Sequence, residues 1–172
     1  MAFDSGFPPY VSVAEKKAKA ERALEELRKE NPDVNPVVVQ ARQIVKTWWG
    51  KAWTDNLESY ADYANRIARG RSYVRHGSVL DLNITSCRVE ALVLGSGFAP
   101  YQVDVTIKPL SPKRWETIKK SCEGRIDSLP ELMEGKFPES LAESFTMKGK
   151  GLFPSPRDIS LSCSCPDSAK MC

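Results

Sequence analysis

Apolar residues recur at steps of three and four along the tryptophan-rich segment TWWGKAWTDNLESYADYANRIARG, residues 47–70. This spacing is typical of one face of an amphipathic helix, and it holds for Trp49, Trp53, Leu57, Tyr60, Ala61, Ala64 and Ile67. We predict one main helix here, with Gly70 at or just beyond its C-terminal end. The aromatic stripe is interpreted as core; the alternative is a platform on which nucleic-acid bases stack.

After this helix the period changes to two. Apolar and polar residues alternate in SVLDLNITS (78–86) and in PYQVDVTIK (100–108), and RVEALVLGSG (88–97) lies between them. With short turns at Ser86 and at 95–100, this pattern predicts an antiparallel meander with one face on the helix and one in water. The preceding SYVR (72–75) is a candidate edge strand.

A helix is also predicted from Val13 to Glu30, where strong helix formers precede a proline. Its apolar side is thin, so the helix lies across the domain or projects as an arm, and a solvated surface helix is the alternative interpretation. That side consists of Ala14, Ala18, Ala23, Leu24 and Leu27.

The remainder of the chain alternates short helices with turns. Ser111 is a plausible N-cap and Pro112 a plausible first residue of a helix that closes at Gly124, with Trp115, Ile118 and Cys122 on one side. Two shorter helices are expected near 128–135 and 138–145, then a turn-rich connector over 149–156, then a strand in DISLSCSC.

These elements define an α+β fold, an antiparallel meander packed against the tryptophan-rich helix with further helices. We divide the chain into an N-terminal helical arm (1–38), an α+β core domain (39–156) and a C-terminal zinc-finger segment (157–172). A chain of 172 residues is long enough for one such domain to fold without a covalent staple.

Composition narrows the function classes. With 41% hydrophobic and 27% charged residues, the chain has no apolar run able to span a membrane and no secretory signal pattern. A cytoplasmic protein without a membrane partner is therefore expected. Phosphate-binding glycine loops, zinc-protease motifs and nucleophile elbows are absent from the sequence, which argues against an enzyme and against a small-molecule substrate.

A net charge of +3 is too small to indicate nucleic-acid binding, so the local distribution matters. The stretch RIARGRSYVR contains Arg66, Arg69, Arg71 and Arg75 with no acidic residue among them, interleaved with Tyr73. Guanidinium groups bind phosphates and stack on bases, which makes this run the best nucleic-acid-binding candidate. A solvated helix end is the alternative interpretation. A second basic cluster comprises Lys113, Arg114, Lys119 and Lys120.

A reducing compartment disfavours structural disulfides, so the five cysteines of the chain are considered as metal ligands. Cys163 and Cys165 form a C-x-C pair, and Cys172 follows after a loop that contains Pro166 and Asp167. Three thiolates so placed suit tetrahedral Zn²⁺, which requires one further ligand. His76, the sole histidine, is a weak candidate for it, with water or another chain as alternatives. Cys87 and Cys122 are predicted to be small buried residues.

The ending CSCPDSAKMC resembles the first three ligands of a SWIM zinc finger, whose pattern is C-x-C, a spacer, then C-x-H. The stretches TWWGKAW, RGRSYVRHGSVLDLNI, PYQVDVTIKPL and LFPSPRDISLSCSCPD are similar to a prokaryotic group of SWIM zinc-finger proteins. That group is often linked with helicase-like ATPases of the SWI/SNF type. The resemblance implies Zn²⁺ as cofactor and Cys163, Cys165 and Cys172 as ligands.

This sequence departs from the group's pattern at three places. No ligand histidine follows Cys172, Ser168 stands where an aromatic residue is common, and Ser86 and Cys87 stand where a glycine turn is common. With three thiolates alone, we expect this 172-residue form to bind zinc weakly or not at all and its last residues to be mobile.

Two function classes follow. In the first, the protein is a nucleic-acid-binding or helicase-associated accessory module in which a zinc finger stiffens a basic surface. In the second, it is an adaptor that docks a SWI/SNF-type ATPase without touching nucleic acid. Salt separates them, because affinity for phosphates falls steeply as salt rises, whereas apolar docking shows little slope.

Overall fold

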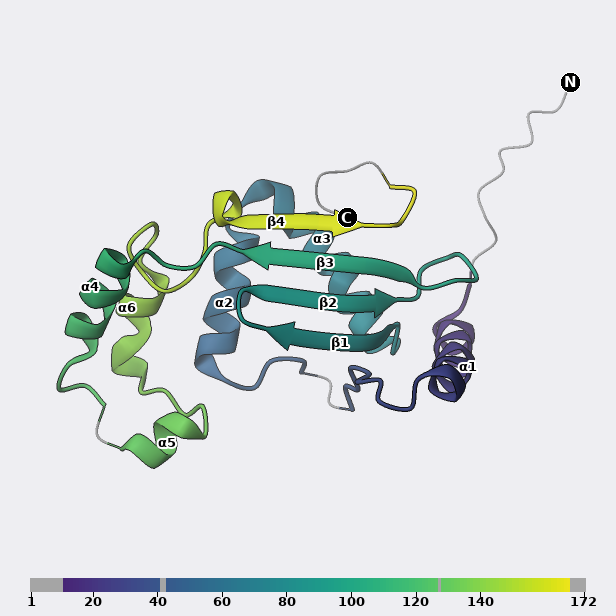
Figure 1. Cartoon of the computed structure of the whole chain (residues 1–172), viewed down its shortest axis with the longest axis horizontal. Coiled ribbons are helices and arrows are strands. Elements are labelled where there is room, and N and C mark those ends of the chain that lie inside the picture. The colour runs from purple at the N-terminus through teal and green to yellow at the C-terminus, as the bar shows by residue number, and fades with distance from the viewer. Residues whose placement is uncertain (1–10, 41–42, 127, 168–172) are drawn as a thin grey trace, which may run out of the picture.

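The computed structural model describes residues 11–40, 43–126 and 128–167. The chain forms a four-stranded sheet. Figure 1 shows helices behind this sheet and at both of its ends. In chain order, the elements are α1 (Val13–Glu30), α2 (Trp48–Glu58), α3 (Ala61–Arg75), β1 (Val79–Thr85), β2 (Arg88–Val93), β3 (Tyr101–Ile107), α4 (Pro112–Cys122), α5 (Leu129–Met133), the 3₁₀ turn Glu139–Leu141, α6 (Ala142–Thr146), the 3₁₀ turn Pro156–Asp158 and β4 (Ile159–Cys163). The predicted α+β class is confirmed.

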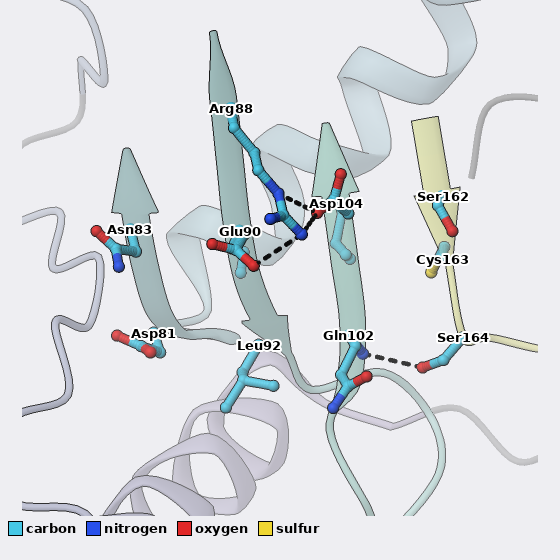
Figure 2. A pocket seen from close by; sticks show the side chains of 12 residues that line it. Asp81, Asn83, Arg88, Glu90, Leu92, Gln102, Asp104, Ser162, Cys163 and Ser164 are labelled. Carbon is cyan, nitrogen blue, oxygen red and sulfur yellow. Dashed lines mark hydrogen bonds and ion pairs between the residues drawn. The ribbon is translucent and has the colours of Figure 1, made fainter. Parts of the chain in front are cut away.

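The sheet is antiparallel throughout, with strand order β1-β2-β3-β4. Its first three strands are the predicted meander, and alternation places Asp81, Glu90 and Asp104 on one face of the sheet, as Figure 2 shows. The outer edge of β1 is occupied by an extended segment, because the Leu82 amide donates to the Asn35 carbonyl. One edge of the sheet is therefore already paired.

The fourth strand, β4, lies beside β3 although residues 108–158 separate them in sequence. The register places Ile159 opposite Ile107 and Cys163 opposite Val103. β4 thus carries the C-terminal cysteine pair to the edge of the sheet.

The predicted tryptophan-rich helix is two helices, and this is a correction. α2 ends at Glu58, and the backbone N–H of its C-cap, Ser59, donates a hydrogen bond to the Asp55 carbonyl. Tyr60 is extended (φ −99°, ψ 118°) before α3 begins. The apolar spacing continues across the break, which is why the sequence suggested one helix. Both helices lie behind the sheet in Figure 1.

The end of α3 also differs from the prediction. Gly70 lies inside α3, which continues to Arg75, with His76 as C-cap and Gly77 at φ +71° beyond it. Residues 72–75, considered as an edge strand, are the last turn of this helix, so that prediction is wrong.

The bounds predicted for α1 are confirmed. The Ser12 side chain accepts the Glu15 amide while Glu15 bonds back to the Ser12 amide, which closes a capping box. Of the two placements considered, the helix lies across the end of the sheet, because Ala20 is buried against Leu80 and Leu94. Ala23, Leu24 and Leu27 complete this contact.

A second core cluster joins α2 to the helices after β3. Trp48 packs against Phe145 with ring centroids 5.7 Å apart, and Trp53 meets Phe153 edge-on at 5.1 Å. The Trp49 indole nitrogen donates to the Gly135 carbonyl at 3.0 Å. These contacts confirm the interpretation of the tryptophan stripe as core.

Two smaller predictions have opposite outcomes. Ser111 caps α4 as expected, and Cys122 is half-buried against the second core cluster. Cys87, by contrast, is exposed at φ +60° in the β1–β2 turn, which is a correction. Its carbonyl accepts a hydrogen bond from the Ile107 amide at 2.8 Å, so the pairing of the strands requires this turn geometry whatever residue occupies the position.

Among the helices of the described ranges, none is long and apolar enough to cross a membrane.

Candidate functional site

The C-x-C pair forms a compact turn at the end of β4. Cys163 is the last residue of the strand, and the Cys165 amide donates to its Sγ atom at 3.5 Å. The Cys165 thiol lies 4.0 Å from the Asp167 carbonyl oxygen. Both cysteines are half-buried. The third candidate ligand, Cys172, lies outside the described residues, as does Ser168.

An ion pair connects this turn to the arginine-bearing helix. Nη1 of Arg66, on α3, lies 2.6 Å from Oδ2 of Asp167. The two residues are separated by 101 positions in sequence. The geometry therefore brings one member of the predicted arginine run to the predicted metal turn.

The arginine run is divided between different environments. Arg66, Arg69 and Tyr73, spaced by three and four, border one hollow next to the cysteine turn. Arg71 instead pairs with Glu58 of α2 at 2.6 Å. Arg75 is exposed and borders a separate hollow beneath α1. The arginine run contains no acidic residue in sequence, but carboxylates from elsewhere in the chain pair with two of its arginines.

The hollow between α3, the sheet and the cysteine turn has a volume of about 410 Å³. Its wall contains Cys163 and Cys165, and its apolar part consists of Val74, Val79, Val93, Tyr101 and Val103. The loop after β2 fits closely against the Tyr101 ring, because a Cβ atom at Gly95 would lie 2.4 Å from Cε2 of that ring. Glycine at this position therefore lets Tyr101 form a wall of the hollow.

A second hollow, of about 460 Å³, adjoins the first and shares with it Arg69, Tyr73, Gly95 and Ser96. Lys16 and Lys19 of α1 border it, and Lys19 Nζ donates to the carbonyls of Gly95, Ser96 and Gly97 at 2.7 to 3.2 Å. Sequence reasoning missed these two lysines, because nothing in their spacing indicates that α1 reaches α3.

His76 borders this second hollow and not the one that Cys163 and Cys165 line. Burial, followed by the positive charges of Lys16 and Lys17, lowers the pKa of its imidazole. Among the described residues, no group of three histidines, cysteines or carboxylates is arranged to hold a metal ion.

The opposite face of the sheet is polar and acidic (Figure 2). Arg88 Nε lies 2.7 Å from Asp104 Oδ2, and its Nη2 lies 3.0 Å from Glu90 Oε1. The hydrogen bond to Asp104 and the charges of Asp104 and Glu90 raise the pKa of Arg88. Asp81 also lines this hollow of about 590 Å³, so its charged lining residues are three carboxylates and one guanidinium. This face repels a polyanion.

In the second basic cluster, Arg114 forms hydrogen bonds within the protein. Arg114 Nε donates to the Gly151 carbonyl at 2.9 Å, and Nη2 donates to the Gly151 and Phe153 carbonyls. Lys119 pairs with Glu116 at 2.6 Å. Arg114 therefore holds the connector that leads to β4.

Comparison with known proteins gives one informative similarity. The chain is 35% identical over 130 residues to a Mycobacterium tuberculosis (strain ATCC 25618 / H37Rv) protein described as "Uncharacterized protein Rv2102". The alignment covers 75% of this chain and 47% of that protein, so the chain spans about half the length of this curated relative. No protein family model and no solved structure matches the chain.

Proposed function

We propose that this chain is a SWIM-type zinc-finger module that binds nucleic acid as an accessory to a helicase-like ATPase, and that it is not an enzyme. The observation that carries the proposal is the ion pair between Arg66 and Asp167. It joins the C-x-C turn to the helix that presents Arg69 and Tyr73. A metal bound in the turn would fix the position of the arginine-bearing surface.

The chemistry of the turn fits zinc. Cys163 and Cys165 are soft ligands two residues apart, and the Cys165 amide donates to Cys163 Sγ at 3.5 Å, which holds the turn compact. In the proposal, Cys172 is the third ligand and a histidine of the C-x-H pattern is the fourth. Bound Zn²⁺ supplies a tetrahedral centre that closes the loop and adds folding free energy.

Zinc content tests this part directly. We expect stoichiometric zinc, by elemental analysis after extensive dialysis, in a chain extended by Lys-His directly after Cys172. The 172-residue chain should hold little. The extended chain with Cys163→Ser and Cys165→Ser is the matched control and should hold none. Absence of zinc from the extended chain would contradict the metal assignment.

The nucleic-acid part of the proposal has its own matched pair on α3. Arg69 makes no ion pair with a carboxylate of the described residues, whereas Arg71 is held by Glu58. We expect Arg69→Ala to weaken binding and to reduce the slope of log K against log salt by about 0.7 to 0.9, the value of one phosphate contact. Arg71→Ala should change both less. Equal isotherms for wild type and Arg69→Ala would remove this surface from the proposal.

An adaptor role is the second candidate, and one observation favours it. Leu129 and Met133 of α5 are 67% and 81% exposed. They form an apolar patch at the end of the molecule where α4, α5 and α6 lie. If the adaptor role holds, a purified SWI/SNF-type ATPase should bind the wild-type chain at high salt. The double variant Leu129→Ser, Met133→Ser should not bind it. Binding that disappears at high salt would contradict the adaptor role.

A further inference from the structure

We propose that the two adjoining hollows form one groove for a single nucleic-acid strand, in which the hollow of about 410 Å³ receives one unstacked base. The inference rests on the proposed nucleic-acid-binding function and specifies its substrate class. It requires an occupant with a flat heterocycle and a flanking anionic backbone.

The first observation is a glycine without a structural reason. Gly70 lies in the interior of α3, where glycine costs about 1 kcal/mol relative to alanine. Its φ is not positive, and a Cβ atom added there would meet no atom within 4 Å. The protein itself therefore makes no use of the missing side chain. Gly70 borders the hollow, so the lack of a large side chain at this position leaves the hollow open for a ligand.

The second observation is the lining of the hollow. Val74, Val93 and Val103 provide an apolar floor, and Tyr101 provides an aromatic wall. Tyr73, at the boundary with the second hollow, is 40% exposed and offers a ring on which the next base stacks. An apolar cavity with aromatic rings suits a nucleobase better than a phosphate or a sugar.

The third observation is the charge along the groove. Arg66 and Arg69 border the first hollow, and Lys16 and Lys19 the second, whereas Asp167 is the one carboxylate among the described residues that line them. Arg66 already pairs with Asp167. The excess positive charge therefore lies at Arg69 and the two lysines, beside the boundary where Tyr73 would stack a base. The other face of the sheet is acidic, which directs a polyanion to this groove.

Single strands are favoured over duplexes for a geometric reason. In a duplex the bases are paired and stacked, and extruding one costs a few kcal/mol. A single strand presents its bases without this cost. The groove should therefore prefer single strands, and the preference should require a base rather than the backbone alone.

The test uses fluorescence anisotropy of the whole chain at low salt with three labelled probes of equal length: an oligothymidylate, the same strand in a duplex, and an abasic strand. We expect the oligothymidylate to bind at least about 5-fold more tightly than the abasic strand, because each stacked base contributes a factor of about 5 to 150. Gly70→Phe should fill the hollow and remove the contribution of the base bound there, while the contribution of the base stacked on Tyr73 remains. Gly70→Ala is the matched control, since its methyl group leaves the hollow open and suits the helix.

The outcomes separate the two proposals. If none of the probes binds, the proposed nucleic-acid function fails and this inference fails with it. If all three bind equally and Arg69→Ala weakens each of them, the basic surface stands and the base-binding groove is refuted. An unchanged preference in a folded Gly70→Phe variant would refute the location of the base. Should that variant not fold, the comparison of oligothymidylate with the abasic strand in wild type still decides the inference.

Discussion

Arg114 offers the sharpest test of the structure, because the sequence showed it only as a member of a second basic cluster and the structure makes it a clamp between α4 and the connector before β4. The guanidinium lies on α4 and donates to the carbonyls of Gly151 and Phe153, two buried residues of the connector before β4. Gly151 packs closely against the backbone of α6, since a Cβ atom at this position would lie 2.6 Å from the Phe145 carbonyl oxygen. Replacing Arg114 by Met keeps an unbranched side chain and removes every donor.

The expected loss of stability follows from these contacts. A hydrogen bond from a charged donor contributes about 1.5 to 3 kcal/mol, and a buried carbonyl left without a partner costs about 1 to 3 kcal/mol. Arg114 is half-buried, so water reaches part of the vacated space and lowers the total. We expect Arg114→Met to reduce the free energy of unfolding by about 2 to 4 kcal/mol, a large part of the 5 to 15 kcal/mol typical of a domain.

Urea unfolding followed by tryptophan fluorescence measures this loss, because Trp48 and Trp53 pack in the core cluster that contains Phe153. Lys113→Met is the control on the same helix turn: Lys113 is exposed, and its variant should stay within about 0.5 kcal/mol of wild type. Arg114→Lys should recover part of the lost stability, because the ammonium group is still a charged donor. The recovery should be incomplete, since Lys lacks the planar guanidinium that bonds two carbonyls at once. An Arg114→Met variant as stable as Lys113→Met would refute the clamp.

Three further outcomes are expected. Leu141→Ala, at a residue 1% exposed, should lower the free energy of unfolding by about 2 to 5 kcal/mol, and a loss below about 1 kcal/mol would contradict its core position. Cys87→Gly should raise it by about 1 kcal/mol, since the left-handed conformation costs other residues about that much; a loss on urea titration would show that the turn has another geometry. The lowered pKa of His76 means that the unfolded chain takes up the proton more readily, so stability should fall as pH drops below about 6.5. His76→Gln should flatten this dependence, and an unchanged pH profile would exclude His76 as its origin.

Much of the fold could be predicted from periodicity. The first three strands, the capped helices α1 and α4, and the short helices after them follow from spacing and from Ser12 and Ser111 at the caps. The break between α2 and α3 could not, because both helices keep the same apolar spacing across Tyr60. α2 packs against α6 and the second core cluster, a contact between distant segments that local spacing does not show.

The candidate site was less accessible to sequence reasoning. The C-x-C pair and the arginine run are visible as motifs, but their meeting depends on β4 pairing with β3 across residues 108–158. The charges that neutralise Arg66 and Arg71 come from Asp167 and Glu58, and the added lysines come from α1. No local pattern contains such distant neighbours, so the grouping of the site is a tertiary property.

The late arrival of β4 in the chain has a consequence for how the molecule assembles. β1, β2 and β3 are joined by short turns, whereas β4 must close a loop of some fifty residues, at an entropic cost about 1.4 kcal/mol above that of a ten-residue loop. Such non-local pairing slows folding, and it makes the last strand the easiest part of the sheet to detach. Amide hydrogens of β4 should therefore exchange faster than those of β2. Any ligand held by Cys163 and Cys165 then acts as a latch on this strand, and it would slow exchange there while leaving the meander unchanged.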